Sequence, residues 1–144
     1  MGHIESTKTV DAPPAALWAT ISNPGTWSDW FSIHERWMEE PPATLEAGAE
    51  LTAKIVMLGM ANKIEWVVAA VDAPTSMTLT GTGMAGVKVE FTFTLKPVDG
   101  GSEVTVSGDF EGSLIKGALG KAVEKDGRNQ LEKSLNALEA LALA

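Results

Sequence analysis

The residues best suited to chemistry lie in one short stretch, TWSDWFSIHERW, which runs from residue 26 to residue 37. It contains His34, the only histidine well inside the chain, beside Glu35 and among three tryptophans. An imidazole or a carboxylate in an apolar cavity can act as a general acid or base, because burial shifts its pKa. Asp109 is a third candidate, but its place on the polar side of a predicted strand favours a solvated role. His34 is therefore the first candidate for a catalytic residue.

The sequence carries no specific catalytic or metal-binding motif. It has no cysteine and two distant histidines, which do not make a zinc site without a third clear ligand. The glycine-containing segments GMAGVKVE and DGGSE lack the strand–GxxxxGK[ST]–helix context of a phosphate loop, and no GxSxG elbow occurs. We therefore expect no metal and no cofactor, and whether the protein is an enzyme stays open.

The length of 144 residues predicts one domain over residues 1–144, large enough to bury a full core. The net charge of −8 repels phosphate, so nucleic acid is not an expected partner. The N-terminus, MGHIESTKTV, lacks the basic and apolar regions of a secretion signal, and no apolar run approaches the roughly 20 residues of a membrane span. With no cysteine, these features predict a cytoplasmic location.

The elements that must position these residues can be read from the spacing of apolar side chains. Residues 4–10 alternate as in a strand, the segment DAPPAALWATIS favours a helix, and a second short helix is predicted through Trp27, Trp30 and Phe31. Five further segments alternate with period two, each with one apolar face, which indicates an antiparallel meander. These segments are 51–57, 64–70, 77–80, 87–96 and 104–110.

From Leu114 the apolar period becomes helical over about 28 residues, a length of roughly 42 Å at 1.5 Å per residue. A helix this long must lie across the concave face of the sheet to bury its stripe. The predicted stripe consists of Ile115, Leu119, Ala122, Val123, Leu131, Leu135, Leu138 and Ala142. The glycines at 117, 120 and 127 indicate either close packing or a bend, or room for something held beneath the helix.

The segment VDAPPAALWATISNPGTWSDWF resembles the opening of the SRPBCC superfamily, through Ala12–Pro13, Trp18 and Trp30. That superfamily includes START lipid-transfer domains, Bet v 1-like proteins and polyketide cyclase/dehydrase-like proteins. The segments GMANKIEW and GMAGVKVEF resemble an actinobacterial subgroup in which some members are catalogued as toxins of type II toxin–antitoxin pairs. The resemblance implies an α+β helix-grip fold: a curved antiparallel sheet of about seven strands around a long C-terminal helix, with two short helices between strands 1 and 2.

The resemblance also implies a cavity between sheet and helix, open at one end. Alternate connections of a meander share an end, so LGMAN, GTGMAG and EGSLI come together there and present apolar loop residues. These are Leu58, Met60, Met84, Leu114 and Ile115. Exposed apolar tips guard an opening or meet a partner, such as a second copy in a homodimer. The alternative is that they fold inward as a plug.

The prediction for function is binding of a small hydrophobic or amphipathic molecule, lipid-like or polyketide-like, inside this cavity. One alternative is a cyclase or dehydratase that uses the same cavity, and another is the toxin of a toxin–antitoxin pair. The residues expected to contact the ligand are Trp30, His34, Trp37, Ile55, Trp66, Met77, Phe91, Phe93 and Leu119.

The inward face of residues 32–39 is ambiguous. One alternation turns Ile33, Glu35 and Trp37 inward, and the other turns His34, Arg36 and Met38 inward. Either choice directs an ionisable group toward the interior, where it needs a partner, cavity water or the polar end of a ligand. The third possibility is an edge strand that bulges these groups into solvent.

Overall fold

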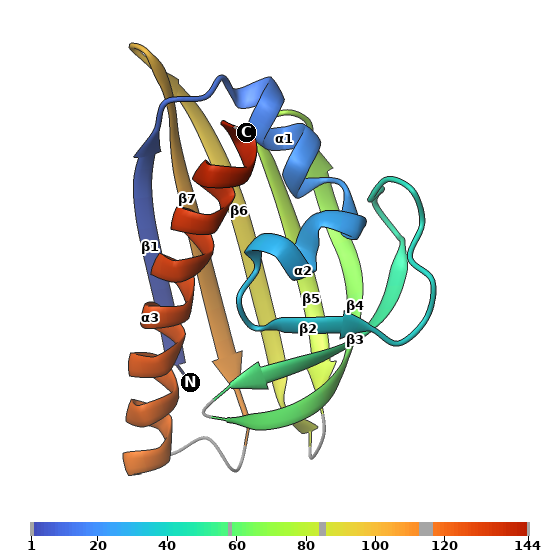
Figure 1. The fold of residues 1–144 in the computed structure, drawn as a ribbon. Coiled ribbons are helices and arrows are strands. Elements are labelled where there is room, and N and C mark those ends of the chain that lie inside the picture. Colours follow the sequence, from blue (N-terminus) through green and yellow to red (C-terminus); the bar gives the residue numbers. More distant parts are fainter. Residues whose placement is uncertain (1, 58, 84–85, 113–116, 144) are drawn as a thin grey trace.

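The computed structural model describes residues 2–57, 59–83, 86–112 and 117–143. In this part of the chain seven antiparallel strands form one curved sheet in the order β1-β7-β6-β5-β4-β3-β2 (Figure 1). The first strand pairs with the last, and β2 and β1 are the edges. The strands are β1 (Gly2–Val10), β2 (His34–Trp37), β3 (Glu50–Met57), β4 (Met60–Asp72), β5 (Ser76–Gly83), β6 (Lys88–Val98) and β7 (Gly101–Glu111).

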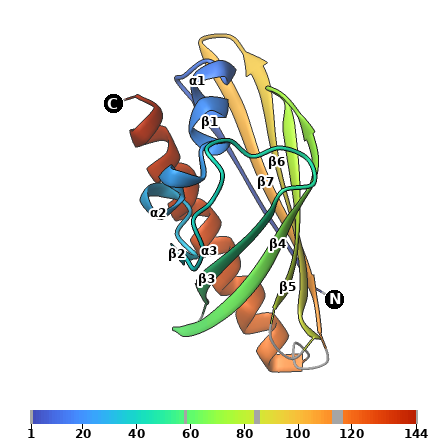
Figure 2. The same cartoon turned by 90° about the vertical axis from the view of Figure 1, so that its right-hand side faces the viewer.

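Two short helices, α1 (Pro14–Ile21) and α2 (Trp27–Trp30), connect β1 to β2, with the 3₁₀ turn η1 (Pro24–Thr26) between them. Pro14 occupies the first position of α1, where a missing N–H costs nothing. Both helices lie on the same side of the sheet as α3 (Gly117–Ala142), as Figure 2 shows. This arrangement confirms the predicted α+β helix-grip fold.

The core lies between the inner face of the sheet and the helices. Strands β4 and β6 alternate buried and exposed residues, as period two predicted. Ile64, Trp66 and Val68 project inward from β4, and Phe91 and Phe93 project inward from β6. Each strand therefore contributes one face to a single apolar core.

The long helix α3 buries only part of its apolar stripe. Its 26 residues span about 39 Å at 1.5 Å per residue. Its buried residues begin at Gly127 and end at Leu138, and none of residues 117–126 is buried. Leu119, predicted to face the sheet, is 43% exposed. Gly127 is thus the first buried residue of the helix, and the first ten residues are more exposed than the sequence predicted.

The edge strand β2 resolves the ambiguity in residues 32–39, and neither simple alternation is right. The register shifts between His34 and Arg36, so a bulge interrupts the alternation. Ile33 and His34 are both buried, whereas Glu35 and Arg36 are exposed. The bulging edge strand is thus correct for Glu35 and Arg36 and wrong for His34. Glu35 turns outward to an ion pair with Lys54 at 3.0 Å.

Candidate functional site

The described residues of the core contain one continuous group of rings, which we call the aromatic cluster. Trp27 lies at its centre, with ring centroids 5.4 Å from Phe31, 5.3 Å from Trp37 and 6.0 Å from His34. Most pairs meet edge to face, the arrangement that ring quadrupoles favour. The cluster comprises Trp27, Trp30, Phe31, His34, Trp37, Trp66, Phe91 and Phe93.

The TWSDWF segment concentrates rings in the core because α2 is a single turn. Trp27, Trp30 and Phe31 are spaced at i, i+3 and i+4, so they share one face of that turn. The indole N–H groups of the stretch are held by the chain just before it. Trp27 Nε1 donates to the Ile21 carbonyl at 2.9 Å, and Trp37 Nε1 donates to the Pro24 carbonyl at 2.7 Å. These tryptophans are therefore fixed structural members of the core.

His34 and Trp66 differ from those tryptophans, because their buried polar atoms have no partner. His34 is 5% exposed and Trp66 is 1% exposed. His34 Nδ1, His34 Nε2 and Trp66 Nε1 are, within the described residues, the buried side-chain nitrogens and oxygens that make no hydrogen bond. Burial lowers the pKa of His34 to about 4, so its imidazole is neutral at pH 7. A buried polar group without a partner costs about 1–3 kcal/mol.

Two glycines, one on β5 and one on β7, allow the inward rings to lie close to the sheet. A Cβ at Gly81 would stand 2.8 Å from the Trp66 ring, and a Cβ at Gly108 would stand 2.7 Å from the Phe91 ring. Trp66 and Phe91 in turn contact each other, with centroids 5.8 Å apart. The orientation of the Trp66 indole thus depends on the absence of a side chain at Gly81.

We expect Gly81→Ala to lower the free energy of unfolding by about 1 to 2 kcal/mol, because the new methyl would lie 2.7 Å from Ile64 Cδ1 and 2.8 Å from the Trp66 ring. Gly83→Ala is the matched control on the same strand, since its Cβ would come no closer than 3.7 Å to Val87. The control should change stability by less than about 0.5 kcal/mol. Urea unfolding of both variants measures the difference, and equal losses would contradict the close packing of Ile64 and Trp66 on Gly81.

Most residues predicted to contact the ligand lie in the core. Trp30, His34, Trp66, Phe91 and Phe93 belong to the aromatic cluster. Of the remaining predicted residues, one belongs to the cluster, two pair with its members through the sheet register, and one lies outside it. Ile55 pairs with His34, Met77 pairs with Phe93, Trp37 is half-buried within the cluster, and Leu119 is exposed in the first turn of α3. Their contact with a ligand stays a prediction.

The end of the sheet that was predicted to open carries exposed apolar side chains. The ends of β3, β5 and β7 and the start of α3 all lie at this end (Figure 1). Met60 is 51% exposed and Leu119 is 43% exposed. Four other residues predicted to border the opening fall outside the described residues: Leu58, Met84, Leu114 and Ile115.

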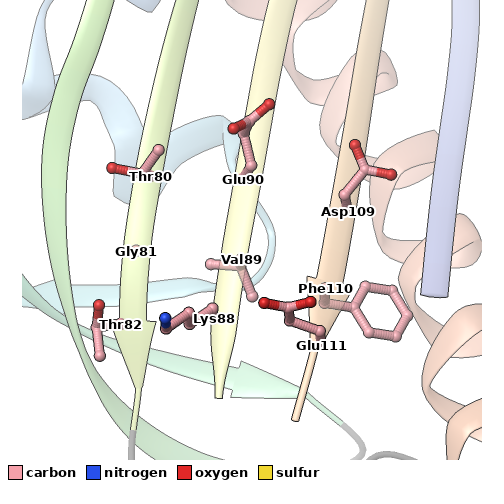
Figure 3. A pocket seen from close by; sticks show the side chains of 9 residues that line it. All are labelled: Thr80, Gly81, Thr82, Lys88, Val89, Glu90, Asp109, Phe110 and Glu111. Atoms are coloured by element: carbon pink, nitrogen blue, oxygen red, sulfur yellow. The ribbon is translucent and has the colours of Figure 1, made fainter. Parts of the chain in front are cut away.

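Asp109, the third catalytic candidate, is exposed and does not lie in the core with His34. Its side chain projects from the outer face of the sheet, beside a hollow of about 550 Å³ that Lys88, Glu90 and Glu111 also line (Figure 3). Asp109 Oδ1 lies 2.6 Å from His3 Nδ1, and this hydrogen bond raises the pKa of His3. The solvated role predicted for Asp109 is therefore confirmed, and it does not join His34.

The described residues bring no three histidine, cysteine or acidic side chains together in a way that could hold a metal ion. Within the same residues, no helix has the length and apolar character needed to cross a membrane.

The strand order, the long C-terminal helix and the core beneath it define a helix-grip protein of the SRPBCC type. The chain belongs to the family described as polyketide cyclase / dehydrase and lipid transport, whose model matches residues 1–142. Among curated relatives, the Mycobacterium tuberculosis proteins named "Uncharacterized protein Rv1546" and "Toxin Rv0910" are 31% and 30% identical over 135 residues. In both cases the match covers 94% of each chain.

Solved structures share the fold at lower identity. The Zhui aromatase/cyclase from Streptomyces sp. R1128 has a TM-score of 0.79 at 17% identity, covering 98% of this chain and 93% of its own. TTHA0849 from Thermus thermophilus has a TM-score of 0.78 at 19% identity, covering 98% and 97%. The structure named Ara h 8.0201 has a TM-score of 0.70 at 21% identity, covering 98% and 97%. At these identities the likeness establishes the fold alone.

Proposed function

We propose that this protein binds a small hydrophobic or amphipathic molecule between the inner face of the sheet and α3. The observation that carries the proposal is the unmet hydrogen-bonding capacity of His34 and Trp66 inside the aromatic cluster. A ligand that supplies the missing partners recovers the free energy lost by burying them, about 1–3 kcal/mol for each group. Apolar walls with a few placed polar groups are the usual composition of small-molecule sites.

The first turns of α3 support the same location. Leu119 is exposed and Val123 is half-buried there, although both lie on the apolar stripe that the second half of the helix buries. Together with Met60 they leave apolar surface beside the end predicted to open. Contact with an apolar ligand would remove this surface from water, which is favourable by about 25 cal/mol per Å².

The family description supports a lipid-like or polyketide-like ligand, since it names polyketide cyclases, dehydrases and lipid transport together. The aromatase/cyclase among the fold neighbours supports the polyketide-like alternative. The prediction of a toxin role rests on the name shared by two relatives at 30% identity. No contact in the aromatic cluster bears on that role.

The site favours binding over acid–base catalysis. A general base works best when its pKa is near the operating pH, but burial holds the pKa of His34 near 4. Its ring nitrogens lack the carboxylate or carbonyl partner that orients a catalytic imidazole. Glu35, the neighbouring candidate, points outward to Lys54. Cyclase or dehydratase activity in the cavity predicted from the sequence is therefore the second hypothesis.

We expect the protein purified from its own host to carry a small molecule that native mass spectrometry detects. A ligand at 100 times its dissociation constant should stabilise the fold by about 2.7 kcal/mol and raise Tm by roughly 5 to 10 °C. The variant Thr78→Val, on the outer face of β5, should show the same rise. Repeated recovery of bare protein, with no rise in Tm across fatty acids and polyketides, would refute the proposal.

A further inference from the structure

We propose that two copies of this chain associate through β1, by pairing their edge strands antiparallel into one continuous sheet. The side of α3 that lies next to β1 completes the interface. The interface does not use Met60 or Leu119, the exposed apolar residues at the predicted opening, and it is independent of ligand binding.

The two edges of the sheet differ in how open they are to another strand. β2 is four residues long, and its pairing with β3 is interrupted by the bulge that follows His34. β1 is nine residues long and pairs with β7 from Gly2 to Val10 without a register shift. Short or bulged edges resist pairing with another chain, whereas long regular edges accept an added strand. Figure 1 shows the free side of β1 at the boundary of the sheet.

The backbone groups on the free side of β1 can be identified from two contacts. The N–H of His3 points away from β7, since it donates to Glu124 Oε2 of α3 at 3.4 Å. The carbonyl of Val10, which has the opposite parity, lies against Gly101 of β7. Because successive residues of an antiparallel strand point their N–H and C=O groups to opposite sides, the odd-numbered residues face the free side. In the described part of the chain, the exposed residues with unpaired backbone groups on this side are Glu5, Thr7 and Thr9.

A second copy of β1 matches this row of groups. In the register that places the two Ser6 residues opposite each other, Thr7 faces the partner's Glu5, and the pair exchanges two backbone hydrogen bonds. Lys8 then faces the partner's Ile4, so no like charges are opposed. A register centred on Glu5 would place two carboxylates directly opposite each other, which is destabilising.

One side of α3 overlooks the β1 edge. Asn136 accepts a hydrogen bond from Lys8 at 2.9 Å, and Glu139 lies 3.5 Å from the same amine. A hollow of about 300 Å³ lies between α3 and residues 6–8, so the helix leaves the edge accessible. Residues spaced by three and four share this side, which is basic in its first half and acidic in its second. We call them the α3 flank: Lys121, Lys125, Arg128, Glu132, Asn136 and Glu139.

A two-fold axis through Ser6 turns the two α3 flanks antiparallel, so the basic half of each lies beside the acidic half of its partner. His3 contacts Glu124 and Lys8 contacts Asn136, so Ser6 lies level with the stretch between them. The axis therefore brings Arg128 of one copy beside the partner's Glu132. The flank residues without an ion pair, in the described part of the chain, are Lys121, Lys125, Arg128 and Glu132.

The charge balance favours a second copy as the occupant of this edge. The net charge of −8 makes copies repel one another, and the unpaired cations of the α3 flank offset that repulsion beside β1. A second copy supplies both the matching strand and the matching charges. A strand from another protein would match both only by chance.

Analytical ultracentrifugation tests the proposal on the full chain, at about 5 to 500 µM and low ionic strength. The parent should change from monomer to dimer within this range. Thr7→Pro should weaken dimerisation at least about tenfold, because it removes an N–H on the free side at two symmetric places. Thr7→Val is the matched control, since it keeps that N–H and loses the same hydroxyl contact with Thr105. It should dimerise like the parent.

Charge reversal on the α3 flank tests the two-fold arrangement separately. Arg128→Glu and Glu132→Lys should each weaken dimerisation by about 3- to 10-fold, because each places like charges across the axis. An equal mixture of the two variants should form a heterodimer about as tight as the parent dimer, since every pair across the axis is again of opposite charge.

Three results would overturn the proposal. A parent that stays monomeric at about 500 µM would leave the β1 edge to an extended segment of another protein. A dimer that persists in a folded Thr7→Pro variant would place the interface elsewhere on the surface. If circular dichroism shows that Thr7→Pro does not fold, failure of the charge-reversed mixture to restore association would have the same meaning.

Discussion

Between pH 7 and pH 4.5 the protein should lose about 2 to 3 kcal/mol more of its free energy of unfolding than its His34→Phe variant loses. The cause is the difference between an ordinary histidine pKa of 6.5 in the unfolded chain and a pKa of about 4 in the fold. Below pH 6.5 the unfolded chain binds a proton that the folded protein does not. The part of the free energy of unfolding that depends on a neutral His34 is therefore fully present above pH 6.5 and is lost as the pH falls toward 4.

The comparison with His34→Phe isolates this effect. Phenylalanine keeps an aromatic ring beside Trp27 and Trp37 and removes the titrating group. The hydrogen bond that His3 donates to Asp109 raises the pKa of His3, so His3 contributes in the opposite direction, but it is present in both proteins. Its contribution, like that of the shared carboxyl groups, cancels in the difference between the two proteins.

Urea unfolding at the two pH values measures both proteins. Equal losses would show that His34 finds a proton acceptor or water in the fold and is not an unpartnered ring. At pH 7 the variant should be at least as stable as the parent, because it removes two buried nitrogens without partners.

The sheet could be predicted from sequence because its signal is local. Alternation within each strand follows from the pleat, and five segments with one apolar face have few ways to bury those faces together. The predicted strands 87–96 and 104–110 correspond to β6 and β7, and their inward residues are those predicted. Strand ends were less well predicted, since β4 extends to Asp72 and β5 to Gly83.

The orientation of β2 could not be predicted because it is set by pairing with another strand. The bulge between His34 and Arg36 depends on how an edge strand meets β3. No residue in IHER marks a bulge by its type. The burial of α3 could not be predicted for a similar reason. Its apolar stripe continues to Leu119, but only residues in its second half are buried against the rest of the protein.

The inward positions of the core rings were predicted, but their hydrogen bonding was not. Spacing placed Trp66 and Phe91 on inward faces, but it gave no sign that Trp66 lacks a partner or that Gly81 accommodates its ring. Both facts depend on atoms brought together from different strands. The one available signal was Gly81, which takes an apolar position in the segment TLTGTG. A glycine inside a strand often marks a place where another group approaches the backbone closely.

Trp27→Phe should be less stable than Trp66→Phe by about 2 to 4 kcal/mol at pH 7, although both variants make the same chemical change in the same core. Both residues are buried, and both lose the same volume, so the cavity contributions are similar. The difference lies in the indole nitrogen. Trp27 Nε1 donates to the Ile21 carbonyl at 2.9 Å, whereas Trp66 Nε1 donates to nothing.

In Trp27→Phe the Ile21 carbonyl loses its partner at the end of α1, which adds the cost of an unmet buried acceptor. In Trp66→Phe the buried unpaired donor is removed, which offsets part of the lost packing. Urea unfolding followed by circular dichroism measures both without relying on the altered tryptophans. Equal stabilities would mean that the Trp66 indole is satisfied in solution, and the hydrogen-bonding argument for a ligand at this position would then be wrong.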